Sequence, residues 1–338
     1  MLRSLALAAS AAAAVATAHT HGAFTCAVNP ELGTHGFPDC IQPGPVTDDL
    51  DAMQHSMVCK QRGTADQILI GTIGDSITAG ACSSGGNHTY PAQLQIMLDQ
   101  EAPGKYAVTN LGACGSTMQK SPNGDSPYWQ RPQYTTLTQN KWDILVILLG
   151  TNDAKDPIDG GPNNCECRAA RERDRCPRGA RSNRPRSAPR LSSSAGHCGI
   201  GDIDMDNCPF VTDYLSMIAL AQTLGRDAST PPIIYAMIPV PLMQHGSIGA
   251  NQTVINSVYP TLIPLISAKA KLTTVPINNF AVMGGVSNWQ SVFPSGCTLN
   301  SPWPACPWWC DAQHCDQCHP NDNGYTHLAQ SVKAGLGL

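Results

Sequence analysis

Residues 68–80 read Ile-Leu-Ile-Gly-Thr-Ile-Gly-Asp-Ser-Ile-Thr-Ala-Gly, and this stretch decides the fold. The apolar run at its start is typical of a strand buried on both faces, and the glycine at 74 ends it. A helix is predicted to follow. The serine at 76 therefore stands at the carboxyl edge of a parallel sheet, where open α/β folds place their sites. Such a serine is either a nucleophile or a helix cap, and residues 68–80 alone favour neither.

The chain beyond this stretch alternates short apolar runs with longer amphipathic ones. This alternation predicts a parallel sheet covered by helices on both faces. Pro260 and Pro264 are expected to break or bend the helix predicted at 254–271. Further strands are expected at 106–110, 142–149, 233–238 and 274–277, and helices at 90–100, 211–224, 254–271 and 324–336.

A second polar motif lies near the other end of the chain. Residues 316–325 read Asp-Gln-Cys-His-Pro-Asn-Asp-Asn-Gly-Tyr. An Asp and a His three residues apart on a turn can face one point. There the imidazole of His319 can take a serine proton and return it to a leaving group, while Asp316 holds the ring tautomer. The alternative is a turn that carries a surface histidine.

Two glycine-containing segments follow the other predicted strands. Residues 110–117 read Asn-Leu-Gly-Ala-Cys-Gly-Ser-Thr, and residues 150–153 read Gly-Thr-Asn-Asp. A glycine lets a backbone N–H approach a developing oxyanion, and an asparagine amide can donate a further hydrogen bond. Glycine and asparagine are also common turn residues, so neither segment is specific by itself.

Taken in order, these four segments resemble the sequence blocks of the GDSL esterase/lipase family, the SGNH hydrolases. The resemblance covers Ile68 to Gln330. It implies a three-layer α/β/α flavodoxin-like fold with parallel sheet order 2-1-3-4-5. It also implies ester hydrolysis through an acyl-enzyme, with no metal or organic cofactor.

The same resemblance assigns roles to individual residues. Ser76 would attack the ester, His319 would act as general base and then acid, and Asp316 would orient the imidazole. The oxyanion hole would consist of the N–H groups of Ser76 and Gly115 and the side chain of Asn152. Gly112 is the alternative to Gly115 in the second block.

The amino terminus is predicted to be a signal peptide over residues 1–18. A positive charge at Arg3 precedes an apolar run, and residues 16–18 form a small-x-small cleavage site. The alternative is a membrane anchor, but the run is shorter than the ~20 residues of a spanning helix. We therefore expect a secreted protein, with a cysteine-containing extension at 19–66 and the hydrolase domain at 67–338.

The cysteine content agrees with export. Fifteen cysteines are ordinary for an oxidised secreted chain, and three of them, Cys82, Cys114 and Cys318, lie beside proposed site residues. Sequons at Asn87 and Asn251 are candidates for glycosylation. The alternative to disulfides near the C-terminus is a zinc site, because the cysteines and histidines there have zinc-like spacing: Cys306, Cys310, His314, Cys315, Cys318 and His319. Such a site would also occupy His319, the proposed base.

An arginine-rich insertion at 165–196 interrupts the hydrolase domain. Residues 165–190 contain nine arginines and three acidic residues, so the remainder has 12 basic and 22 acidic residues. The insertion has almost no large apolar side chains and is predicted to be disordered, or to be translated intron sequence. The alternative is a basic interaction arm. Nucleic acid is not an expected partner of the acidic remainder.

The expected substrate is a small acyl ester, with an acetyl group on a carbohydrate as the leading candidate. Trp308 and Trp309 could stack on sugar faces, or they could pack a disulfide-rich loop. Short-chain, lipid-like esters are an alternative. A catalytically inactive extracellular binding module of the same fold is another. Neither oligomeric state nor acyl length follows from the sequence.

Overall fold

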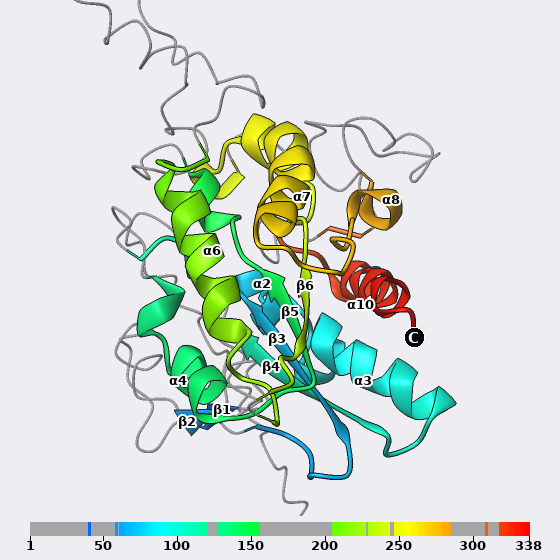
Figure 1. Cartoon of the computed structure of the whole chain (residues 1–338). Helices are drawn as coiled ribbons and strands as arrows, with labels where there is room; N and C mark the ends of the chain where they lie inside the picture. Colours follow the sequence, from blue (N-terminus) through cyan, green and yellow to red (C-terminus); the bar gives the residue numbers. More distant parts are fainter. Residues whose placement is uncertain are drawn as a thin grey trace, which may run out of the picture.

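A four-stranded parallel sheet forms the centre of the protein (Figure 1). The computed structural model describes residues 40–41, 58–59, 61–120, 127–155, 205–227, 229–243, 247–284, 308–309 and 318–338. The strands lie in the order β4-β3-β5-β6. Their bounds are β3 (Ile68–Gly74), β4 (Tyr106–Gly112), β5 (Ile144–Leu148) and β6 (Ile233–Ala236).

The strands are apolar along their length because both faces of the sheet are covered. In β5, Leu145 and Ile147 belong to one hydrophobic cluster, and Ile144, Val146 and Leu148 belong to another. Successive side chains of a strand point to opposite faces, so each cluster takes alternate residues. The central strands β3 and β5 pair in register, with Ile70 opposite Ile144.

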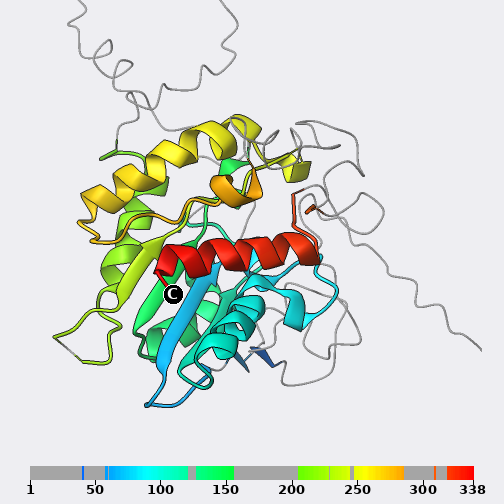
Figure 2. The same ribbon diagram turned by 90° about the vertical axis from the view of Figure 1, so that its right-hand side faces the viewer.

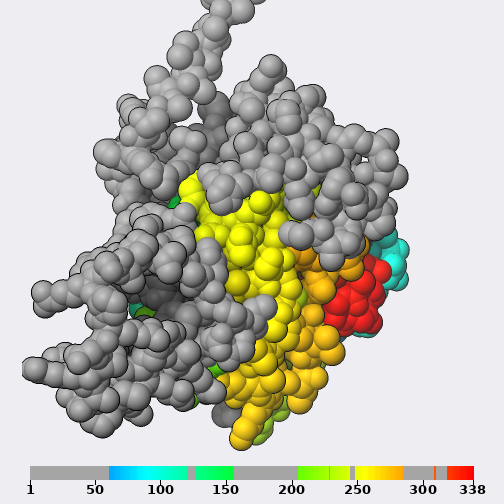
Figure 3. Space-filling view, turned by 90° about the horizontal axis from the view of Figure 1, so that it is seen from above, coloured from blue at the N-terminus to red at the C-terminus, as the bar shows by residue number. Residues whose placement is uncertain are grey.

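Helices form a layer on each side of the sheet. One cluster joins it to α3 (Tyr90–Glu101) and α10 (Asp322–Leu336), which lie side by side in Figure 2. The other cluster joins it to α4 (Pro132–Gln139), α6 (Pro209–Ala221) and α7 (Tyr259–Lys269). Seen from above, α7 (yellow) forms a broad surface, with α10 (red) to one side (Figure 3).

The predicted fold class is confirmed, with strand order 2-1-3-4 among the four strands. The fifth expected strand, at 274–277, is reduced to one parallel bridge between Ile277 and Met237. Ile277 still occupies the fifth position, because its N–H donates to Ala236 and its carbonyl accepts from Ile238. The short bridge leaves the neighbouring Val275 81% exposed, so this segment lacks the two-sided burial of a central strand.

The predicted helices are found with shifted ends. The break expected in the third of them is a π-helical turn, Val254–Val258, before α7, and Pro264 is accommodated inside α7. The helix α4 was not predicted, although a proline at its first position is a helix-start signal. The short helix α8 (Phe280–Met283) completes the described part of this region.

Part of the N-terminal extension is described as a short antiparallel pair, β1 (Cys40–Ile41) with β2 (Val58–Cys59). The predicted signal peptide, the rest of residues 19–57 and the arginine-rich insertion lie outside the described residues. Among the residues that are described, no helix combines the length and apolar character needed to cross a bilayer.

Candidate active site

Ser76 is the first residue of the short helix α2 (Ser76–Ala79), directly after strand β3. The helix cap is the preceding residue, Asp75, whose Oδ1 accepts a hydrogen bond of 2.9 Å from the N–H of Ile77. Asp75, and not Ser76, is therefore the residue that caps α2. The Ser76 hydroxyl is free of that role and can serve as a nucleophile.

Gly112 brings the end of β4 against α2. A Cβ at this position would lie 2.1 Å from the backbone nitrogen of Ala79, so no other residue fits without a shift of the backbone. The N–H of Gly112 donates to Oδ1 of Asn110 at 2.9 Å. Because this N–H is already bonded, the alternative that made Gly112 an oxyanion donor loses its physical basis.

Gly115 follows in a turn at the carboxyl end of β4. Its φ of 69° lies in the left-handed region, which glycine adopts without steric cost. No hydrogen bond within the described part of the chain uses the N–H of Gly115 or of Ser76. Both groups are thus available as donors to a bound oxyanion.

His319 meets Ser76 although 243 residues separate them in the chain. The imidazole Nε2 lies 2.7 Å from the serine Oγ, and the two residues are 1% and 2% exposed. A buried pair at this distance has the geometry of a general base beside a nucleophile. Asp316, the predicted orienting carboxylate, lies outside the described residues.

Asn152 and Asp153 connect the segment 150–153 to the turn that follows β4. The Asn152 Nδ2 donates to the carbonyl of Ser116 at 2.9 Å, which leaves the second amide hydrogen for another acceptor. The Asp153 carboxylate accepts from the N–H groups of Met118 at 2.8 Å and Gln119 at 3.0 Å. Complete burial raises the pKa of Asp153 to about 7, despite these bonds. The three contacts hold the turn that carries Gly115.

Asp75 is a second fully buried carboxylate of the site. Burial raises its pKa to about 6, while the Ile77 N–H, the nearby His319 and the Thr151 hydroxyl act in the opposite direction. Its Oδ2 has no hydrogen-bond partner within the described residues. Ionising Asp75 therefore costs more free energy in the folded protein than in the unfolded chain.

Asp75→Asn is expected to make the free energy of unfolding less dependent on pH. The folded pKa of about 6 lies above the ordinary value of 3.8, so the folded state loses stability relative to the unfolded chain as pH rises between them. The loss due to Asp75 is about 3 kcal/mol. Asparagine keeps the cap and carries no charge. Urea unfolding of the variant and the parent at about pH 4 and 7.5 measures the difference, and equal pH dependence would contradict the expectation.

The two predicted substrate-stacking tryptophans occupy different environments. Trp309 is 1% exposed and packs in the hydrophobic cluster of α3 and α10. Its assignment to sugar stacking is therefore wrong for this structure, because a buried indole offers no face to a substrate. Trp308 is partly buried and stacks on His327, with ring centroids 3.8 Å apart.

Two of the six residues of the zinc alternative, Cys318 and His319, lie in the described part of the chain. Cys306, Cys310, His314 and Cys315 lie outside the described residues. Among the residues that the structure does describe, no three metal-ligating side chains come together. His319 is described, and its Nε2 faces Ser76.

Comparison with known proteins decides the family. The sequence model of the GDSL-like lipase/acylhydrolase family matches residues 72–327. The chain belongs to this family. The family resemblance drawn from the four motifs is thus confirmed, and the GDSL-like family is one of ester-cleaving enzymes.

Individual relatives of this GDSL-like chain are distant or partial. An acetylxylan esterase of Xylanibacter ruminicola is 38% identical over 91 residues, which are 27% of this chain and 18% of that protein. A carbohydrate acetylesterase family member from Sinorhizobium meliloti has a TM-score of 0.45 at 14% identity, over 80% of this chain and 99% of that one. The acetylxylan esterase Axe2 from Geobacillus stearothermophilus has a TM-score of 0.44 at 14% identity, over 82% and 96%.

Several residues of the site were not singled out by the motifs. Neither the capping role of Asp75 nor the links made by Asp153 were predicted from the four motifs. Aspartate before a short helix is a cap signal that could have identified the first. The bonds of Asp153 run to backbone N–H groups more than 30 residues away, and no sequence pattern encodes such contacts.

Proposed function

We propose that the chain is a secreted serine esterase that releases a small acyl group through an acyl-enzyme. One observation carries the proposal: the 2.7 Å contact between Ser76 Oγ and His319 Nε2, at the carboxyl edge of the sheet and almost closed to solvent. Low exposure strengthens the electrostatic interactions on which the reaction depends. Family membership supplies the reaction class, ester cleavage.

The reaction runs in two stages. His319 Nε2 takes the hydroxyl proton as Ser76 Oγ attacks the acyl carbonyl, and the same proton then leaves with the alcohol. Water repeats the sequence on the acyl-serine and frees the acid. Asp316 would accept the other ring N–H of His319 and stabilise the imidazolium, as in the family resemblance.

The developing oxyanion would be bound by three donors. These are the N–H groups of Ser76 and Gly115, which have no partner within the described part of the chain, and the second amide hydrogen of Asn152. All three are preorganised, since Asp75 caps α2 and since Asn152 and Asp153 tie down the turn of Gly115. Preorganised donors stabilise the transition state without reorganisation during the reaction.

An acetyl group on a carbohydrate is the proposed substrate. Support comes from the 91-residue match to a protein named as an acetylxylan esterase. The match covers 27% of this chain and 18% of that protein. The competing substrate class is a lipid-like ester with a longer acyl chain.

Secretion is part of the proposal. It is supported by the signal-like residues 1–18 and by the fifteen cysteines of the chain, a content that suits an oxidising compartment. Of the two sequons, Asn87 is exposed, whereas Asn251 is 8% exposed and its Oδ1 accepts from the N–H of Thr253. A glycan is therefore proposed at Asn87 only. The secreted protein should begin at His19 and lose mass at Asn87 on enzymatic deglycosylation.

A fluorophosphonate probe followed by substrate profiling tests the proposed function. The folded protein should form a covalent adduct that peptide mass spectrometry locates at Ser76, and Ser76→Ala should form none. Acetylated xylo-oligosaccharides should then be cleaved faster than aryl esters of longer acyl chains. A folded protein with no adduct would be an inactive binding module, and faster cleavage of longer chains would replace the carbohydrate by a lipid-like substrate.

A further inference from the structure

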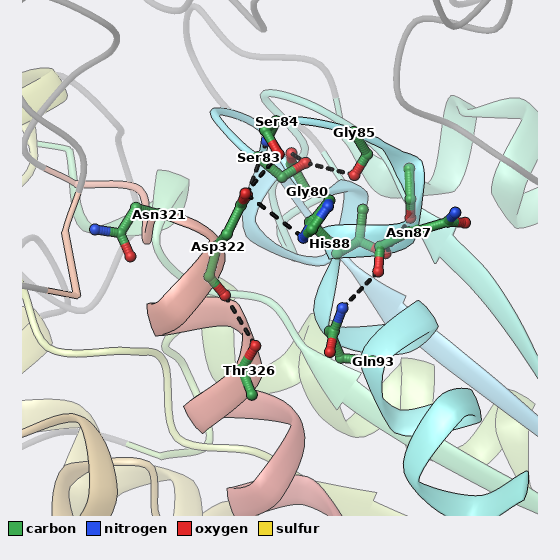
Figure 4. A network of polar contacts seen from close by, with 12 residues as sticks. Gly80, Ser83, Ser84, Gly85, Asn87, His88, Gln93, Asn321, Asp322 and Thr326 are labelled. Carbon is green, nitrogen blue, oxygen red and sulfur yellow. Dashed lines mark hydrogen bonds and ion pairs between the residues drawn. The ribbon is translucent and has the colours of Figure 1, made fainter.

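A cluster of polar contacts joins the start of α10 to the loop that follows α2. Asp322, the first residue of α10, accepts hydrogen bonds from the backbone N–H of Ser84 at 2.8 Å and from its hydroxyl at 2.5 Å. The His88 Nδ1 lies 3.5 Å from the same carboxylate. Figure 4 shows Asp322 reaching from the helix to Ser84 and His88. The partners are 238 residues apart along the chain, so this is a tertiary link.

A buried contact reinforces the same link one turn further along α10. The hydroxyl of Tyr325 donates to the carbonyl of Ala81 at 2.6 Å, and the tyrosine is fully buried. The start of α10 is also bonded to Trp308, because the N–H of Asn321 donates to the carbonyl of Trp308 at 3.0 Å. The first turn of α10 is thus held from two directions.

The loop after α2 needs such a partner. Gly80 and Cys82 both have left-handed backbone, with φ of 92° and 68°. A non-glycine residue in that region costs free energy and persists only where its surroundings hold it. The hydroxyl of Ser83 bonds within the loop to the carbonyl of Gly80, at 2.7 Å (Figure 4). Asp322 and Tyr325 both connect this turn to α10, Asp322 through Ser84 and Tyr325 through the carbonyl of Ala81.

The two joined segments carry the two reacting side chains. Ser76 opens α2 directly before the loop, and His319 lies three residues before Asp322. The separation of Oγ and Nε2 therefore depends on how the loop and the start of α10 are placed relative to each other. A displacement of about 1 Å in such a pair can lower a rate on the order of a hundredfold.

We propose that Asp322 is a positioning residue that fixes the distance between Ser76 and His319. The inference rests on the proposed function, since it concerns how the same pair is aligned. The hydrogen bonds to Ser84 carry the effect. The ion pair with His88 adds little, because the side chains are 48% and 35% exposed and solvent screens their attraction.

The test compares Asp322→Ala with a matched control at the far end of the same helix. There Lys333 Nζ pairs with Glu101 Oε1 at 2.7 Å and joins α10 to α3. Glu101→Ala removes a link of similar kind, away from His319. For each full-length variant we would measure the rate of fluorophosphonate labelling at Ser76, kcat and KM for an aryl acetate, and Tm.

Asp322→Ala should slow labelling and lower kcat by at least about tenfold, with KM little changed, because misalignment weakens the transition state more than substrate binding. Asp322→Asn should lie between this variant and the parent, since its amide can still accept from the Ser84 N–H. Glu101→Ala should keep the parental rates. A purely structural role would lower Tm equally in both variants and leave kcat per folded molecule unchanged, which would overturn the inference.

Two further arms keep the result decisive. If Asp322→Ala does not fold, Ser84→Ala takes its place, and a labelling rate lowered by about threefold or more supports the inference whereas an unchanged rate overturns it. If the parent protein itself is not labelled, the proposed function fails first. A labelled parent with an equally labelled Asp322→Ala protein removes the positioning role alone.

Discussion

His319→Ala is expected to lower kcat for an acetyl ester by about 10⁴- to 10⁶-fold. The Nε2 of His319 is the only described group placed at hydrogen-bond distance from Ser76 Oγ to take its proton. Without a base the hydroxyl is a poor nucleophile at neutral pH. Initial rates with an aryl acetate would measure the loss, and fluorophosphonate labelling should fall with it because both depend on the activated serine.

A second histidine of the same region provides the control. His327 lies in α10 and stacks on Trp308, away from Ser76. His327→Ala should keep kcat within a few-fold of the parent. If His319→Ala retained a tenth or more of the parental kcat while folded, another base would have to be sought and the proposed pair would be wrong.

Asn152→Ala is expected to lower kcat by about 10²- to 10³-fold with little change in KM. The side chain is fully buried and one of its amide hydrogens holds the carbonyl of Ser116. The other hydrogen is the proposed donor to the oxyanion, which exists only in the transition state and intermediates. Loss of such a donor therefore appears in kcat rather than in KM.

Asn256 offers a matched buried asparagine outside the site. Its side chain bonds to the carbonyl and the N–H of Leu242, both at 2.8 Å. Asn256→Ala should lower Tm through two lost hydrogen bonds but keep kcat per folded molecule. If Asn152→Ala behaved in the same way, with lower Tm and parental kcat, Asn152 would be a structural residue and the oxyanion assignment would be wrong.

Local sequence predicted the strands because each has to satisfy a simple condition. The central strands of a two-sided parallel sheet are buried on both faces, so an apolar run such as 144–148 predicts a strand almost residue by residue. The same condition does not apply to the segment at 274–277, where a strand was predicted and only a single bridge is found. It lies at the sheet edge with Val275 exposed, and an edge needs neither the length nor the burial of a central strand.

The site was predicted in its residues but not in its supporting contacts. Ser76 and His319 belong to motifs with short, specific spacing, and the contact between them agrees with the roles predicted for them. Asp322 and Ser84 carry no such signal, because either residue is equally common on a solvated turn. Trp309 shows the opposite error: an aromatic side chain near a site suits a substrate or a core, and only its 1% exposure distinguishes the two.

Sequence by itself determined the fold class and the family, and it predicted that Ser76 and His319, which the structure brings into contact, act together. These follow from short-range patterns, since hydrophobic periodicity and motif spacing are properties of neighbouring residues. Tertiary structure alone decided which residue caps α2, which of the two glycines has an N–H that no described residue accepts, and which segment lies against the start of α10. These depend on contacts such as Asp322 to Ser84, which form only when folding has brought together segments 238 residues apart, against the entropy cost of closing that loop.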